Sequence, residues 1–310
     1  MNDGVDCAVV GAGAAGLSAA LVLGRARRRT LVIDADEQSN RASDVIGGLL
    51  GYDQRPPAEL YAAGREELAS YPSVECRRGR VLRGRRVEGG FLLQVDDGSE
   101  ICARRVLLAT GMDYCPPQLP GLAQLWGTSV FQCPFCHGWE MRDKRLAALA
   151  ADGTALHAGL MLRGWTDDLV VLTDGPAELS DESLRILKSA DVTVDDRRIV
   201  ELIGEQGQLT EIAFADGTRL PRDGLLVEAP LRQRSPLAQQ LGVADTAGSV
   251  GVDEMKVDAL HCTTVDGVFA AGDNCTKHPS LADAINAGSK AAMMIVQSLL
   301  ADEYGLPYPP

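Results

Sequence analysis

Short apolar runs and helical patterns alternate at the start of the chain. Residues 6–10 (DCAVV) form an apolar run that leads into GAGAAG at 11–16, and residues 16–28 have the Ala/Leu-rich pattern of a helix. A second apolar run, TLVID at 30–34, follows at once. Apolar runs bounded by glycine are typical of buried strands, and longer Ala/Leu-rich runs are typical of helices. We therefore expect the chain to open with a strand–helix–strand (βαβ) unit.

The alternation continues and then breaks after residue 111. Residues 58–70 have a helical pattern, 74–105 read as short strands, and RVLLATG at 105–111 reads as a buried strand ending at Gly111. CPPQLPG at 115–121 is rich in proline and glycine, which favours a connector. We expect a domain boundary at this connector.

A second α/β pattern extends from residue 145 to about 227. Its apolar runs are LAALA and LVVLT at 169–173, and its helices are expected near 154–163 and 180–189. Residues 230–250 are polar and rich in loop-forming residues, which suggests a return crossing.

The last part of the chain predicts one strand and one long helix. GVFAAGD at 267–273 reads as the strand, and an Ala-rich helix is expected from about 281 to 300. We expect this part to rejoin the first domain, so that the middle domain is an insertion. The expected borders are 1–115 and 236–310 for the two segments of the outer domain and 116–235 for the inserted domain.

Composition and charge narrow the function classes. Apolar residues make up 45% and charged residues 24% of the 310 positions, which describes a globular protein and excludes disorder and fibres. The net charge of −13 argues against nucleic acid or an anionic membrane as partner. No apolar run approaches the roughly 20 residues that span a bilayer. The N-terminal MNDGVDC carries acids where a signal peptide carries Lys or Arg, so a cytoplasmic location is expected.

The cysteines point to a single redox or metal motif. Only one pair, Cys133 and Cys136, has the CxxC spacing among the eight cysteines. A structural zinc site needs a second close pair of ligands, and the chain has only four histidines, so no metal is predicted. The pattern favours reduced thiols and one redox-active pair.

The glycine-rich string after the first strand predicts a dinucleotide site. In GxGxxG, Gly11 permits a tight turn, Gly13 lets a pyrophosphate approach the backbone, and Gly16 packs the helix on the strand. Helix N-terminal amides, here including those of Ala14 and Ala15, then face the phosphates. Asp34 comes 18 residues after Gly16, near the spacing expected of an acid that binds ribose; the alternative is a solvated acid at a strand end.

Two further strings favour FAD over NAD as the cofactor. They are Ala109, Thr110 and Gly111, and the AAGD string that ends with Gly272 and Asp273. With GAGAAG, a CxxC after the crossover and the long final helix, the chain resembles the low-molecular-weight thioredoxin reductase family from residue 5 to about 300. The resemblance implies an α/β flavoprotein with two dinucleotide-binding domains, FAD as cofactor and a homodimer.

The resemblance also assigns roles near the flavin. The N-terminus of the final helix, at Asp283 and Ala284, would face the flavin ring, and the acidic Asp283 departs from the glutamine usual in the family. Cys136 would be the sulfur next to the flavin, and Cys133 the sulfur that meets the substrate. Where the reductases have Asp after the second cysteine, this chain has His137, which we interpret as the base, with Asp283 as a possible orienting group.

The string CPFCHG leaves other interpretations open. The two cysteines could be buried structural thiols, and CPFC also occurs in glutaredoxins, although a glutaredoxin is much shorter and has no use for FAD. His137 could be purely structural. Residues 43–57, Trp126 and Trp139 are candidates for the wall of a substrate pocket, and each Trp is as well explained by core packing.

The middle domain lacks the residues that bind NADPH in the reductases. ADGTA at 151–155 stands where GxGxxA is expected, and Asp152 would face any phosphate. DGPAELSD at 174–181 stands where basic residues would bind the 2′-phosphate. The sequence therefore predicts a degenerate NADPH domain.

In this respect the chain resembles a branch of the family that runs the reaction in reverse. These are dithiol oxidases that close the disulfides of natural products such as gliotoxin and holomycin, in antibiotic biosynthesis and self-resistance. The resemblance implies a small-molecule dithiol as substrate and O2 as acceptor, giving hydrogen peroxide. The alternatives are a disulfide reductase fed by ferredoxin or another protein, against which the charge of −13 counts, and a flavin-containing redox sensor without turnover.

Overall fold

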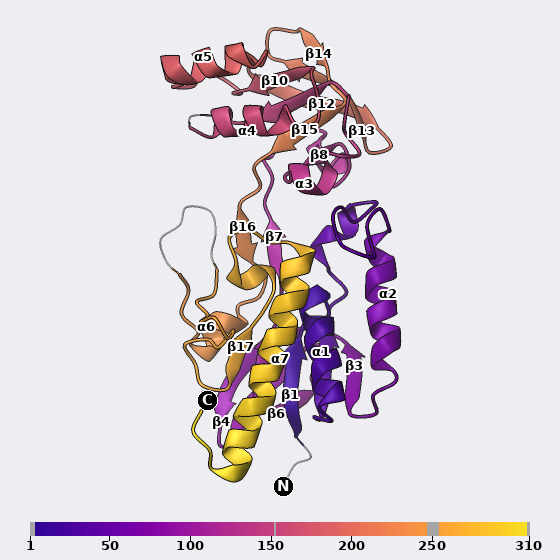
Figure 1. Cartoon of the computed structure of the whole chain (residues 1–310), viewed down its shortest axis with the longest axis vertical. Helices are drawn as coiled ribbons and strands as arrows, with labels where there is room; N and C mark the ends of the chain where they lie inside the picture. Colours follow the sequence, from indigo (N-terminus) through magenta and orange to yellow (C-terminus); the bar gives the residue numbers. More distant parts are fainter. Residues whose placement is uncertain (1–3, 152, 247–253, 309–310) are drawn as a thin grey trace. The chain divides into compact units, whose positions relative to one another are not determined.

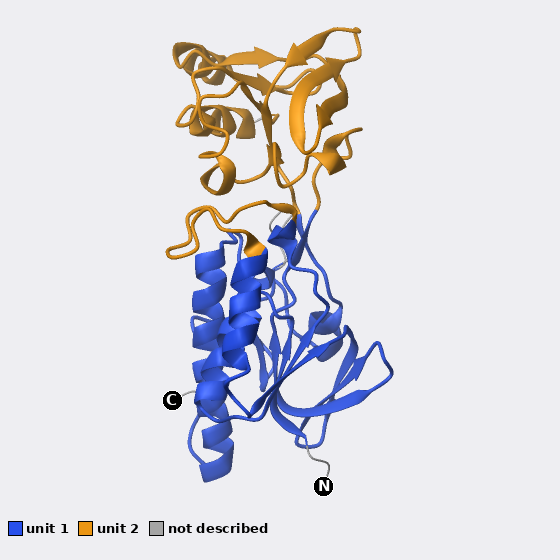
Figure 2. Ribbon diagram, turned by 90° about the vertical axis from the view of Figure 1, so that its right-hand side faces the viewer, with its two compact units in different colours: residues 1–41, 58–114, 231–310 blue, residues 42–57, 115–230 orange. Residues whose placement is uncertain are grey.

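The computed structural model describes residues 4–151, 153–246 and 254–308. These residues form two compact units, coloured separately in Figure 2. Unit 1 comprises residues 1–41, 58–114 and 231–310, and unit 2 comprises 42–57 and 115–230. Among the described helices, none combines the length and the apolar composition that a bilayer span requires.

Unit 1 is built on a seven-stranded sheet with the order β3-β2-β1-β6-β5-β4, and β17 pairs with the other end of β6. Strands β3, β2, β1, β6 and β17 run parallel, and β4 and β5 form an antiparallel meander with β6. The strands are β1 (Val5–Val10), β2 (Thr30–Asp34), β3 (Val74–Arg78), β4 (Val81–Val87), β5 (Gly90–Val95), β6 (Glu100–Leu108) and β17 (Val268–Ala270).

The inner parts of the central strands are continuous apolar runs, residues 7–10 in β1 and 31–33 in β2, because both faces of the sheet are covered there. Cys7 and Val9 of β1 pack with the helices on one face, and Ala8 and Val10 pack on the other. The helices of unit 1 are α1 (Ala14–Arg25), α2 (Pro57–Leu68), α6 (Leu237–Leu241) and α7 (Leu281–Tyr304), with short 3-10 turns η1 (Ser39–Ala42) and η3 (Asp273–Cys275).

Helices α1 and α7 lie side by side (Figure 1) at a separation that requires a glycine. A Cβ atom on Gly288 would overlap the carbonyl oxygen of Ala15. The hydroxyl of Ser18 donates to the carbonyl of Ile285 over 2.8 Å and fastens the two helices at the same level. The close contact fixes the start of α7 relative to the first turn of α1.

The segment expected to be a polar return crossing contains regular structure. Strand β16 (Leu231–Gln233) pairs with β7 (Met112–Tyr114), and α6 follows. Leu237 and Leu241 are both buried in the hydrophobic cluster that also contains Val81 of β4, and they have the i, i+4 spacing of one helix face. The glutamines between the two leucines concealed this short apolar face in the sequence.

Unit 2 repeats the plan of unit 1 on a smaller scale. Its parallel sheet has the order β11-β10-β9-β15-β8, and a three-stranded antiparallel sheet, β12-β13-β14, stands beside it. The strands are β8 (Val130–Phe131), β9 (Leu146–Leu149), β10 (Leu169–Leu172), β11 (Thr193–Asp195), β12 (Ile199–Glu205), β13 (Gln208–Phe214), β14 (Arg219–Pro221) and β15 (Gly224–Val227). The helices are η2 (Leu122–Gln124), α3 (Pro134–His137), α4 (Thr154–Leu162) and α5 (Asp181–Ser189).

The borders of the two units differ from the expected 115 and 235, chiefly because residues 42–57 belong to unit 2. We call this segment the 42–57 loop. A Cβ on Gly127 would be crowded by Ala42, and a Cβ on Gly47 would overlap the backbone of Cys136. Two glycines thus allow the loop to lie directly against the backbone around the CxxC motif.

Candidate active site: three turns, a dithiol and a buried histidine

Three turns follow three neighbouring strands of unit 1 and lie against one another. They follow β1, β6 and β17, and their leading glycines, Gly11, Gly111 and Gly272, have positive φ angles. A Cβ on Gly11 would overlap the carbonyl of Ala109. The carboxyl edge of adjacent parallel strands is where α/β sheets bind their ligands.

The third turn is tied to the second by Asn274, a residue that the sequence reasoning did not select. Its buried side-chain amide donates to the carbonyl of Leu108 over 2.9 Å and to the hydroxyl of Thr110 over 3.3 Å. A Cβ on Gly272 would also crowd Ala15. The structure therefore brings the GAGAAG, ATG and GD strings together.

The first turn of α1 has the features of a phosphate-binding site. Gly13 caps the helix without a side-chain hydrogen bond, and the first turn carries no acid. A Cβ on Gly13 would have nothing within 4 Å, so the space above the turn is open on the protein side. The free amides and the positive end of the helix dipole suit a pyrophosphate.

Two acidic residues, Asp34 and Asp273, lie beside this turn, and their carboxyl groups have different surroundings. The carboxylate of Asp34, at the end of β2, accepts the backbone N–H of Asp36 over 3.0 Å, which holds it in place. Asp273 is partly buried, and burial raises the pKa of its carboxyl, while the Tyr114 hydroxyl donates to it over 3.2 Å. A partly buried carboxyl of this kind is suited to accept a hydrogen bond from a ligand hydroxyl.

Asp283 takes part in the cap at the start of α7. The hydroxyl of Ser280 donates to the Asp283 carboxylate over 2.8 Å and accepts the Asp283 backbone N–H over 3.1 Å. Ala284 is buried beside it. His137 belongs to unit 2, so an orienting contact between Asp283 and His137 stays a prediction.

The dithiol stands at the start of α3, a single helical turn. Cys133 is the N-cap residue, with extended backbone, and Pro134 occupies the first turn, where a missing N–H costs nothing. The hydrogen bond from Cys136 to the Cys133 sulfur, and then the backbone N–H groups of Cys136 and Phe135, lower the pKa of Cys133 to about 7, against an opposing effect of burial. The same hydrogen bond and burial raise the pKa of Cys136.

This asymmetry assigns charge and proton in the reduced pair. When the reduced pair loses its first proton, the negative charge lies on Cys133, and Cys136 keeps its proton. A thiol with a pKa near the ambient pH is both nucleophilic and a good leaving group in disulfide exchange. Cys133 therefore has the electronic character of an exchanging sulfur.

His137 is packed tightly within unit 2. Its ring is stacked on Phe131 with centroids 5.5 Å apart and planes 16° apart. Its Nε2 lies 3.2 Å from the carbonyl oxygen of Gly127 and 3.3 Å from the hydroxyl of Ser43, whereas Nδ1 is buried without a hydrogen bond. Burial lowers the pKa of His137, so the ring is neutral at neutral pH. Neither Ser43 nor Gly127 stands out in the sequence.

Apolar side chains near the CxxC motif are exposed. The ring of Phe135 is 70% exposed and meets Trp165 edge-on, with centroids 5.6 Å apart. Trp139 is 57% exposed under the guanidinium of Arg142. Trp126, by contrast, packs on the core of unit 2. Leu50 in the 42–57 loop is also fully solvent-exposed.

The second nucleotide-type site of the fold departs from the glycine-rich pattern. Between β9 and α4 only Gly153 remains, and Asp152 lies outside the described residues. After β10, the Asp174 carboxylate accepts the backbone N–H of Ile199 over 2.7 Å and lies 3.6 Å from Arg198. The sequence did not reveal that this acid is already partnered by β12 and its preceding arginine.

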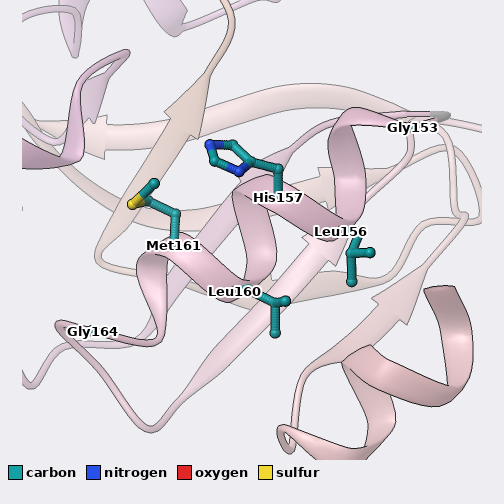
Figure 3. A pocket seen from close by; sticks show the side chains of 6 residues that line it. All are labelled: Gly153, Leu156, His157, Leu160, Met161 and Gly164. Carbon is teal, nitrogen blue, oxygen red and sulfur yellow. The ribbon is translucent and has the colours of Figure 1, made fainter.

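A cavity of about 510 Å³ on α4 offers no redox chemistry (Figure 3). It is lined by Gly153, Leu156, His157, Leu160, Met161 and Gly164. It contains no cysteine, and its lining residues all belong to α4 or flank it. Within the described ranges, no group of three His, Cys, Asp or Glu side chains is placed to hold a metal ion.

Comparison with known proteins agrees with this reading of the turns. The sequence matches the family described as pyridine nucleotide-disulphide oxidoreductase over residues 5–291. It is 31% identical to thioredoxin reductase tcpT of Claviceps purpurea, over 97% of this chain and 96% of that protein. The structure superposes on an oxidoreductase from Agrobacterium tumefaciens with a TM-score of 0.90 and 34% identity, covering 96% and 99% of the two chains. The structure of HlmI gives a TM-score of 0.91 and 31% identity, covering 98% and 95%.

Fold and site thus define an FAD-dependent disulfide oxidoreductase with two dinucleotide-binding domains. The chain belongs to the pyridine nucleotide-disulphide oxidoreductase family and is thioredoxin reductase-like. The predicted fold class, the family resemblance and FAD as cofactor are confirmed.

Proposed function

We propose that the protein is a dithiol oxidase that forms an intramolecular disulfide in a small natural product of the dithiolopyrrolone or epidithiodiketopiperazine type. The substrate gives up two electrons and two protons, and O2 takes up both to become hydrogen peroxide. The redox pair is Cys133 and Cys136, cycling between disulfide and dithiol.

One contrast carries the proposal. Unit 1 keeps all three glycines of its first strand–helix turn, whereas the corresponding turn of unit 2, between β9 and α4, keeps only Gly153. Gly13 leaves open space for a pyrophosphate, and a side chain at that position would fill it. A chain with a dithiol, an FAD site and no second phosphate turn must receive its electrons from something other than NADPH, and a substrate dithiol is the simplest donor.

The sulfur chemistry uses the asymmetry of the pair. A substrate thiolate attacks the Cys133 sulfur, the Cys133–Cys136 bond breaks, and Cys136 leaves as a thiolate, which takes up one of the two protons that the substrate thiols release. The second substrate thiolate then attacks the substrate sulfur of the mixed disulfide, which forms the product disulfide and releases Cys133. The low pKa of Cys133 favours this last departure, because a weakly basic thiolate leaves faster.

A base is required before the electrons can leave the pair. In the reduced pair the proton resides on Cys136, the sulfur that the family resemblance assigns to the flavin side. Cys136 must therefore lose this proton, and neutral His137, the next residue, is the base that we assign. Bound FAD supplies the two-electron acceptor and the site at which O2 is reduced. The turns at Gly11–Gly16, Ala109–Gly111 and Gly272–Asp273, together with Asp34, would hold it.

The exposed apolar side chains favour a compact, apolar substrate. Phe135 lies between the two cysteines in sequence and is largely exposed, and Trp139 follows directly after Gly138. Uncharged bicyclic dithiols can bury apolar surface on such rings at about 25 cal/mol per Å². A protein donor that is recognised by its charge would gain little from contact with these apolar rings.

The test is oxygen uptake by the purified yellow protein with dithiothreitol in one cell and NADPH in another. Uptake with the dithiol, peroxide formation and no bleaching by NADPH are expected. Cys136→Ser should abolish uptake and keep the flavin, and Cys76→Ser, an exposed cysteine on β3, should change neither. Flavin bleaching by NADPH would overturn the proposal.

A second arm separates the oxidase from a protein-fed reductase. The flavin is photoreduced without oxygen, and a small disulfide is then added. Rapid reduction of that disulfide by the photoreduced protein, together with failure to consume oxygen with any dithiol, would favour the reductase instead.

A further inference from the structure

We infer that Ser43 is a positioning residue for His137: its hydroxyl, with the Gly127 carbonyl, fixes the ring as the Nε2–H tautomer and leaves the Nδ1 lone pair as the base. The inference rests on the proposed function for its chemistry and on the geometry of unit 2 for the tautomer. No family motif selects Ser43, which comes from the 42–57 loop, far from the CxxC motif in sequence.

The hydrogen bonds determine the tautomer. The Ser43 hydroxyl donates to the carbonyl of Val45 over 2.8 Å, so its only proton is already used. Toward His137, 3.3 Å away, the Ser43 oxygen can then only accept. The Gly127 carbonyl, 3.2 Å from the same nitrogen, is also an acceptor. Two acceptors facing Nε2 require that this nitrogen carries the proton.

The other ring nitrogen is therefore the basic one. Nδ1 is buried and makes no hydrogen bond, and in the neutral Nε2–H tautomer it holds the lone pair. A buried acceptor without a partner costs stability and calls for a functional explanation. Taking the proton of Cys136 would turn Nδ1 into a donor, and the Cys136 thiolate left behind would be an acceptor for it.

The ring has little freedom to reverse this arrangement. Phe131 stacks on one face, and the 42–57 loop is held close by Gly47, whose Cβ position is occupied by the backbone of Cys136. Burial is the largest influence on the pKa of the ring and lowers it, whereas the carbonyl of Gly127, the Glu140 carboxylate and the carbonyl of Cys133 favour the protonated form. Ser43 is the side chain that the loop presents to the ring.

The tautomer can be measured without any turnover. The chain has only four histidines, so protein labelled with ¹⁵N-histidine gives few ring signals, and His137→Gln identifies the one of interest. In the folded holoprotein, His137 should show a protonated Nε2 and an unprotonated Nδ1. Ser43→Ala should give a mixture of both tautomers, and Ser43→Thr should restore the single one.

The kinetic arm uses the same variants in the oxygen-uptake assay with dithiothreitol. Ser43→Ala should lower kcat on the order of tenfold with KM unchanged. The loss is smaller than the full contribution of a general base, because His137 itself remains in place. Ser43→Thr should recover most of it, and Ser70→Ala, an exposed serine of unit 1, should behave as wild type. These results support Ser43 as the positioning residue.

The outcomes separate the two proposals. An unchanged tautomer and unchanged kcat in Ser43→Ala, with an active wild type, overturn the role of Ser43 and leave the oxidase standing. An inactive wild type whose tautomer still depends on Ser43 removes the oxidase and leaves the positioning role. A wild-type His137 protonated at Nδ1 overturns the inference outright.

Discussion

Gly16 packs so closely on Gly11 that a Cβ on Gly16 would overlap the Gly11 carbonyl oxygen, whereas Gly13 between them has no neighbour within 4 Å. The glycines of this one turn are therefore required for different reasons. Gly16 allows α1 to pack closely on the turn, and Gly13 leaves space for the ligand.

This difference predicts opposite outcomes for two similar substitutions. Gly13→Val should fold normally, because its φ of −72° suits any residue, but should lose FAD because the side chain fills the phosphate space. Gly16→Val should not fold stably. The ratio of flavin absorbance to protein, with circular dichroism of the colourless protein, distinguishes the two. A Gly13→Val protein that retains its yellow colour contradicts the phosphate assignment.

The reduced dithiol should show a marked pH dependence. Because the pKa of Cys133 is lowered to about 7, its alkylation by iodoacetamide should rise with pH through that value and then level off. Cys136→Ala removes the largest cause of the lowering, so the midpoint should move upward. Mass spectrometry follows each cysteine, with exposed Cys76, whose pKa is raised, as the internal control. Preferential alkylation of Cys136 below pH 8 would reverse the assigned roles.

Phe135 should discriminate between substrates without supporting the fold. Phe135→Ser should raise KM for an apolar dithiol such as benzenedimethanethiol by about tenfold or more, since an apolar contact of this size contributes about 1.5–3 kcal/mol. KM for dithiothreitol should change little, and so should Tm, because the ring is largely exposed. Leu184→Ser, on exposed α5, is the control. Equal changes in KM for both dithiols would rule out a substrate contact.

Gly288 should be a stability determinant remote from the chemistry. Gly288→Ala places a methyl group against the Ala15 carbonyl and forces α1 and α7 apart, which should cost about 1–3 kcal/mol. Gln297→Ala, at an exposed position of the same helix, should be neutral or slightly stabilising. Urea unfolding followed by circular dichroism measures both. An unchanged Gly288→Ala midpoint would mean that the helices can separate freely.

Local patterns predicted the frame of the fold well. TLVID became β2 without adjustment, and the final helix starts at Leu281 as expected but continues to Tyr304. These elements are buried on both faces or packed along their whole length, so their apolar patterns were strong. The glycine turns could be placed because each follows a buried strand.

The remaining features depended on contacts that no local pattern records. The 42–57 loop contains neither a regular apolar period nor a motif, yet it provides Ser43 and Gly47 to the dithiol region. Trp165 and Phe131 have ordinary core patterns and gave no sign of their places beside Phe135 and His137. Leu237 and Leu241 were hidden by intervening glutamines.

Membership of the 42–57 loop in unit 2 has a consequence for exchanging parts between relatives. The chain passes from one unit to the other at 41–42, 57–58, 114–115 and 230–231. A chimera that transplants only residues 115–230 would therefore combine a dithiol helix with a foreign loop, and lose the Ser43–His137 pairing unless that loop supplied its own. The dithiol region is therefore encoded by two separate segments of sequence, residues 42–57 and 115–230, that must be exchanged together. Substitutions in one segment constrain those that the other tolerates.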